Sequence, residues 1–151
     1  MQNERENTAV QAERLADLTF ELLDRCHEKQ EIIAGKVGLT IAEFKVMRAF
    51  RGESHLSGQE LSNRVQLSGS RMTRILDGLV EKQIVRREIG SKDRRTMEIS
   101  LTEKGQLITE KLQQSYVGAH VDIMKFLPPD AGESVIMAME KLRDAMKSWT
   151  E

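Results

Sequence analysis

Hydrogen-bonding side chains alternate with apolar ones at helical spacing along GSRMTRILDGLVEK, residues 69 to 82. The apolar set follows the i, i+3, i+4, i+7, i+8 pattern and comprises Met72, Ile75, Leu76, Leu79 and Val80. The side chains that point away from this stripe on a helical wheel, or flank that direction, are Ser70, Arg71, Thr73, Arg74 and Asp77. Hydroxyl and guanidinium groups donate hydrogen bonds to base edges and phosphate oxygens. The spacing predicts a helix with an apolar back and a hydrogen-bonding front.

Positive charge is concentrated just after this segment. In VRREIGSKDRR, which begins at residue 85, five of eleven residues are Arg or Lys. Residues 64 to 95 hold nine cations and four anions, or +5, so the remainder of a chain with net charge −1 carries −6. Such a patch on an acidic body can face a polyanion while the body stays away from it. The cations that we expect to contact nucleic acid here are Arg86, Arg87, Lys92, Arg94 and Arg95.

Double-stranded DNA is the polyanion that fits both features, because its major groove, about 12 Å wide, admits an α-helix. Arg71 and Arg74 can reach guanine O6 and N7 or phosphates, and Ser68 with the helix N-terminus can donate N–H groups to a phosphate. Arg94 or Arg95 can enter a narrow minor groove, where negative potential is deepest. Asp93 can pair with Arg95 and fix its direction. The alternative for Arg71 and Arg87 is an ion pair with Glu81 or Glu88.

The preceding elements are predicted from caps and periodicity. Apolar residues at helical spacing indicate a long helix over residues 8 to 34, ended by Gly35 and Gly38. Thr40 and Glu43, then Ser57 and Glu60, have the spacing of capping boxes and start two shorter helices. Ser68 follows after a very short linker and caps the helix over residues 69 to 82.

A change of period marks the next element. Apolar residues alternate with polar ones on both sides of the turn-forming residues 90 to 93, which predicts a hairpin over residues 84 to 101. Thr102 caps a helix over about 103 to 126, which Pro128–Pro129 ends. A last helix begins near Asp130, with inward positions Val135, Ile136, Met139, Leu142 and Met146. The expected fold class is mostly α with a small β-hairpin, in one domain spanning residues 1 to 151.

Residues 56 to 105, LSGQELSNRVQLSGSRMTRILDGLVEKQIVRREIGSKDRRTMEISLTEKG, resemble the winged helix-turn-helix of the MarR family of bacterial transcription regulators. The resemblance implies a recognition helix containing Ser68, Ser70, Arg71, Thr73 and Arg74, and a wing pair of Asp93 and Arg95. It also implies a homodimer formed through the first and last helices, residues 8 to 35 and 103 to 149, around a DNA-binding lobe at residues 40 to 101. Members of this family bind pseudo-palindromic operators and often respond to small ligands or oxidants.

Two positions depart from the family pattern. Gln83 follows the recognition helix where the family usually has Gly, and Gln66 replaces a frequent Gly in the tight turn. Glycine at the end of a helix serves a left-handed cap, so these turns are the local geometry that the resemblance leaves open.

Dimerisation also has a physical reason. One helix-turn-helix makes few base contacts, whereas two copies related by a two-fold axis read two half-sites about one helical turn apart. The terminal helices carry apolar residues for such an interface, among them Leu15, Leu18 and Leu22.

Other site classes have weaker support. The single cysteine, Cys26, cannot form an intrachain disulfide, and residues adjacent to it do not share its helix face. The histidines show no metal-ligand spacing, and we find no phosphate loop or nucleophile motif, so we expect no metal, no cofactor and no enzyme activity. No apolar run reaches the length of a membrane span, and the polar first residues, MQNERENTAV, lack the apolar segment of a secretory signal, so we expect a cytoplasmic protein.

The leading hypothesis is a homodimeric, sequence-specific DNA-binding regulator. It is expected to repress by blocking polymerase at a promoter and to be released by a small-molecule effector, whose binding residues the sequence does not identify. Two alternatives stay open: a winged-helix module that binds protein without DNA, and a regulator that senses oxidants through Cys26. The methionines of the C-terminal helices can line an effector pocket or form plain core and interface.

Overall fold

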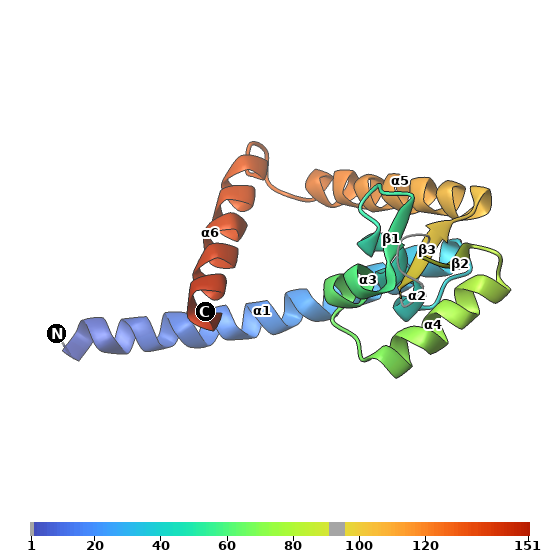
Figure 1. Cartoon of the computed structure of the whole chain (residues 1–151). Helices are drawn as coiled ribbons and strands as arrows, with labels where there is room; N and C mark the ends of the chain where they lie inside the picture. The colour runs from blue at the N-terminus through green and yellow to red at the C-terminus, as the bar shows by residue number, and fades with distance from the viewer. Residues whose placement is uncertain (1, 91–95) are drawn as a thin grey trace. The chain divides into compact units, whose positions relative to one another are not determined.

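The computed structural model describes residues 2–90 and 96–151, with backbone alone for residues 2–5. The described chain forms six helices and three short strands, which are labelled in Figure 1. Their bounds, in chain order, are α1 Gln2–Lys36, α2 Ile41–Ala49, β1 His55–Ser57, α3 Gly58–Val65, α4 Gly69–Glu81, β2 Val85–Ile89, β3 Met97–Leu101, α5 Glu103–Lys125 and α6 Gly132–Thr150. The predicted fold class, mostly α with a small β-hairpin, is confirmed.

The chain divides into two compact units, Met1–Leu112 and Gln113–Glu151, with the boundary inside α5. The first unit contains the helix-turn-helix and the sheet. The division into dimerisation helices and a DNA-binding lobe stays a prediction. Among the described residues, no helix is long and apolar enough to cross a membrane.

Capping side chains begin the short helices as predicted. The Thr40 hydroxyl accepts from the Glu43 N–H at 3.2 Å, and the Glu43 carboxylate accepts from the Thr40 N–H at 2.8 Å. Ser57 and Glu60 form the same reciprocal pair at the start of α3. The first four N–H groups of a helix have no partner within the helix, and a capping box satisfies two of them. The two short helices therefore begin at their capping boxes.

The long first helix extends further than predicted. It runs over Gln2–Lys36 rather than over residues 8 to 34. No Pro or Gly interrupts residues 2 to 7, so nothing in the backbone stops the helix there. Gly38, with φ of 72°, supplies the left-handed conformation that ends it, and the Leu39 N–H bonds to the Ala34 carbonyl at 3.0 Å.

The sheet has the strand order β1-β3-β2, and both pairings are antiparallel. The predicted hairpin is β2 with β3, in which Arg87 pairs with Ile99. Strand β1 was not predicted, because its three residues are too few to show a period of two. It pairs Leu56 with Ile99 on the other side of β3.

The core of the first unit lies between the helices and the sheet. The largest fully buried side chains are Phe44, Phe50, Met47, Leu56, Leu61, Leu79, Ile84, Ile99, Val46 and Val85. The predicted stripe of α4 faces this core through Met72, Leu76 and Leu79. Val80, placed on the stripe by its spacing, is 39% exposed.

The second unit carries apolar side chains that its own chain leaves uncovered. Helix α6 has no buried residue, although the sequence predicted an inward face on it. Val135, Ile136, Met139 and Met146 are exposed, and Leu142 is half-buried. The Pro128–Pro129 corner is confirmed, with α5 ending at Lys125 and α6 beginning at Gly132, two residues after the predicted start.

Candidate nucleic-acid interface

The front of α4 is formed by the side chains that the sequence predicted. Ser70, Arg71, Thr73 and Arg74 are exposed, while Met72, Leu76 and Leu79 on the opposite side are buried. The Thr73 hydroxyl donates back to the Gly69 carbonyl at 2.9 Å. Its oxygen can still accept a hydrogen bond from a ligand. The structure therefore places four of the predicted recognition residues together on one exposed surface.

The N-terminus of α4 differs from those of α2 and α3. Ser68 is its N-cap with extended backbone, as predicted, but its side chain makes no capping hydrogen bond. The first turn of α4 has no acidic residue, whereas α2 and α3 each carry a glutamate there. An uncapped first turn leaves N–H groups and the positive end of the helix dipole for an anion.

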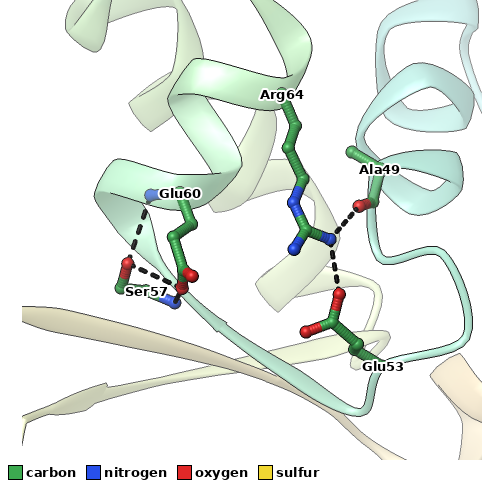
Figure 2. Close-up of polar contacts among 5 residues, drawn as sticks. All are labelled: Ala49, Glu53, Ser57, Glu60 and Arg64. Carbon is green, nitrogen blue, oxygen red and sulfur yellow. Dashed lines mark hydrogen bonds and ion pairs between the residues drawn. The ribbon is translucent and has the colours of Figure 1, made fainter.

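Helix α3 is tied to α2 by an arginine that the charge count assigned to the basic patch (Figure 2). Arg64 donates to the Ala49 carbonyl at 3.0 Å and pairs with Glu53 at 2.6 Å. These contacts within the protein give Arg64 a structural role.

At the other end of α3, the Ser57 N–H and hydroxyl donate to Glu60 at 3.1 and 3.0 Å. These two bonds, the backbone one first, lower the pKa of the exposed Glu60 carboxyl.

The turns on either side of α4 adopt left-handed backbone without glycine. Gln66, between α3 and α4, has φ of 55°, and Gln83, after α4, has φ of 59°. The Gln83 N–H bonds to the Val80 carbonyl and the Ile84 N–H to the Leu79 carbonyl, both at 2.9 Å. This is the Schellman arrangement, and buried Leu79 and Ile84 provide its apolar contact. The departures from the family pattern therefore keep the turn geometry that glycine would supply.

The C-terminal end of α4 is held by two charged side chains, from α2 and α5, and by polar groups of two loops. The buried Glu43 carboxylate of α2 pairs with Lys82 at 2.7 Å, and Lys82 also donates to the Gly38 carbonyl at 3.0 Å. Lys104 of α5 donates to the Lys82 carbonyl at 2.8 Å. Thr102 donates to the Gln83 carbonyl at 2.7 Å. Sequence reasoning counted Lys82 only as a charge and gave Lys104 and Thr102 no role in holding α4.

The two strand arginines have different surroundings. Arg86 is exposed, as a DNA contact requires. Arg87 is 25% exposed and folds onto α4, where Nη2 lies 2.8 Å from Asp77 Oδ1 and donates to the Thr73 carbonyl at 2.9 Å. Glu81 and Glu88, the partners considered from sequence, are not the ones used. Within the described chain, Arg71, Arg74 and Arg86 make no ion pair, unlike Arg64, Lys82 and Arg87.

The tip of the hairpin carries the remaining predicted contacts. Lys92, Asp93, Arg94 and Arg95 lie outside the described residues, so the wing pair stays a prediction. The strands that lead to the tip are placed up to the bond from the Gly90 N–H to the Thr96 carbonyl at 2.8 Å.

The other candidate sites gain little from the structure. Cys26 is exposed on α1, and its neighbour Arg25 is bonded to Glu28 at 2.9 Å. His27 lies 3.7 Å from Glu31. In the described ranges, no three His, Cys, Asp or Glu residues come together to hold a metal. A thiol on an exposed helix face with its nearest arginine already paired is not favoured as a redox sensor.

Comparisons with known proteins agree with this geometry. The MarR family model matches residues 39–97. The transcriptional regulator PrsX of Escherichia coli is 31% identical over 110 residues, 72% of this chain, and the transcriptional repressor MdtR of Bacillus subtilis is 26% identical over 103 residues, 68% of this chain. These matches span 66% of PrsX and 64% of MdtR, less than two thirds of either protein.

Solved structures match over more of their length. Apo MarR from E. coli has a TM-score of 0.74 and 25% identity, over 85% of this chain and 95% of that one. A point mutant of the same protein complexed with operator DNA has a TM-score of 0.69 and 25% identity, over 85% and 92%.

Proposed function

The chain belongs to the MarR family of transcriptional regulators, and from that membership we propose that it is a homodimeric, sequence-specific DNA-binding regulator. The observation that carries the proposal is the division of α4. Its back is buried in the core, and its front presents Ser70, Arg71, Thr73 and Arg74 beside an uncapped N-terminus. This is the arrangement that a helix needs in order to enter a major groove.

Each part of the surface has a separate task. Arg74 and Arg71 read guanine edges or hold phosphates, and the amides that follow Ser68 bind a phosphate and set the register. Arg86, with Lys92 and Arg94, adds phosphate contacts beside the groove. Arg95, directed by Asp93, enters the minor groove. Phosphate contacts supply most of the affinity, and the groups in the major groove supply the discrimination.

The uncovered apolar side chains support a second copy as partner. Leu15, Leu18 and Leu22 of α1 are 45–52% exposed, and α6 has no buried residue. Large exposed apolar patches mark interaction surfaces. Two copies bring two recognition helices to a pseudo-palindromic operator, where the bound dimer blocks polymerase.

Release by a small-molecule effector follows from the family and completes the proposal. An effector can release the protein from DNA only if it binds one state of the dimer more tightly than the other. A state with wrongly spaced recognition helices cannot engage both half-sites. We expect no catalytic activity, and a cytoplasmic location where chromosomal DNA is the partner.

Selection of bound duplexes from a random pool tests the proposal. The expected product is a pseudo-palindrome whose half-sites are about one helical turn apart. The logarithm of its association constant should fall linearly with log salt, at a slope of about −0.9 per phosphate contacted. Failure to enrich any duplex, with no binding at low salt, would contradict DNA recognition and favour a protein-interaction module.

A further inference from the structure

Strand β2 carries two arginines, and the side chain of Arg87 is bonded within the protein. Its Nη2 bonds to the Thr73 carbonyl at 2.9 Å and to the Asp77 carboxylate at 2.8 Å. Its Nε is buried and makes no hydrogen bond inside the described part of the chain. Turning this guanidinium away from α4 would break both contacts.

Asp77 places a negative charge on the surface that is proposed to meet DNA. It shares the front of α4 with Ser70 and Arg74, and its side chain is 62% exposed. An unpaired carboxylate there would repel phosphate. Arg87 neutralises it, and the two charges together add nothing to the net charge of the front.

The pair joins two elements that must reach DNA at the same time. Thr73 and Asp77 lie one helical turn apart in the middle of α4, and Arg87 lies in β2, the strand that runs to the hairpin tip. Both ends of the link are in the first compact unit. We propose that Asp77 and Arg87 are positioning residues that fix the recognition helix relative to the wing, and that Arg87 does not contact DNA.

This inference rests on the proposed function and opposes the simpler assignment of Arg87 as a phosphate contact. The two assignments give opposite signs for one substitution. If Asp77 merely restrains a phosphate-binding arginine, Asp77→Ala removes a negative charge, frees Arg87 and strengthens binding. If the pair positions the helix, Asp77→Ala weakens binding despite the favourable change in charge.

The experiment measures affinity by fluorescence anisotropy over a salt series, with a duplex recovered by the selection described above. The variants are Asp77→Ala, Arg87→Ala, the double substitution and Glu81→Ala. Glu81 is a matched control, since it is exposed on the same helix and makes no ion pair with any residue that the structure describes. Thermal unfolding of each free protein confirms that it is folded at the temperature of the titration.

We expect Asp77→Ala and Arg87→Ala each to weaken binding about fivefold or more, as for a lost charge-assisted contact. The double variant should lie within about twofold of Arg87→Ala, because the two residues act as one unit. The slope of log affinity against log salt should stay at the wild-type value in Arg87→Ala. Glu81→Ala should bind as tightly as wild type or more tightly.

Two results would overturn the inference while leaving the proposed function intact. One is tighter binding by Asp77→Ala. The other is a salt slope reduced by about 0.9 in Arg87→Ala, which is the loss of one phosphate contact. Wild-type protein that binds no duplex would instead overturn the proposed function, and this inference with it.

Discussion

Gly105 determines how closely α5 approaches the chain that leaves the recognition helix. A Cβ atom at this position would lie 2.1 Å from the Ile84 carbonyl oxygen, a backbone atom that cannot move alone. At the same junction the Thr102 N–H donates to the Ile84 carbonyl at 3.0 Å, and the Thr102 hydroxyl accepts from the Gly105 N–H at 3.0 Å. Glycine is therefore required at this position because no side chain fits between α5 and the Ile84 backbone, and not because the position forms a turn.

Gly105→Ala should lower the free energy of unfolding by about 2 kcal/mol or more, because the added methyl forces α5 away from the Ile84 backbone. Gly118→Ala is the matched control in the same helix, where an added Cβ meets nothing within 4 Å. That control should raise stability by up to about 1 kcal/mol. Denaturant unfolding measures both, and equal effects of the two substitutions would contradict the contact.

Arg74 is the residue with which we expect the protein to distinguish bases. Arg74→Ala should reduce discrimination between the selected duplex and a single-base variant by about 1–3 kcal/mol. Binding to random duplex should change little beyond the loss of one charge. Competition titrations measure this, and a uniform loss across all sequences would show that Arg74 contacts phosphate instead.

At the scale of elements, the ion pair between the buried Glu43 of α2 and the half-buried Lys82 holds the C-terminal end of the recognition helix. Lys82→Ala leaves the Glu43 carboxylate buried with one bond from the Thr40 N–H. We expect a loss of about 1–3 kcal/mol in the free energy of unfolding, below the full cost of an isolated buried charge because Lys82 is 37% exposed. Lys45→Ala, on the exposed side of α2, is the control and should have little effect.

The capping box of α3 gives a pH-dependent prediction. Hydrogen bonds from Ser57 lower the pKa of Glu60 from 4.5, so its contribution is present above that pH and is lost as pH falls through the lowered value. The stability difference between wild type and Glu60→Gln should therefore be constant near neutral pH and shrink below about pH 4. Urea unfolding at several pH values measures it, and a difference that persists at pH 2 would contradict the assignment.

Elements were predictable where a local pattern defines them. Two capping boxes, the α4 stripe and the hairpin each lie within a few residues of sequence, and the structure confirms them. Strand β1 was not predictable, because its three residues pair with a strand more than forty positions later. Arg87 with Asp77 and Glu43 with Lys82 join different elements, and their partners depend on how the helices pack. The front of α4 was predicted by periodicity, whereas the side chains that hold it in place were not.

At the scale of the whole molecule, the chain exposes more apolar surface than a lone subunit needs. Phe126 and Trp149 are 89% and 88% exposed, and the face of α6 is uncovered in its own unit. Periodicity on this helix correctly marks an apolar face, but it cannot tell whether the covering surface belongs to the same chain or to another. The sequence therefore predicted inward residues that a second copy, rather than this chain, is expected to bury.

The proposed function requires two subunits to engage one duplex together. The decisive measurement compares the selected duplex with a version that carries five extra base pairs between the half-sites, which rotates one half-site by about half a turn. Two subunits should bind the first duplex, and affinity for the second should fall to the level of random sequence, about 10³-fold or more. Equal affinity for both duplexes, or a complex with a single subunit, would contradict the proposal.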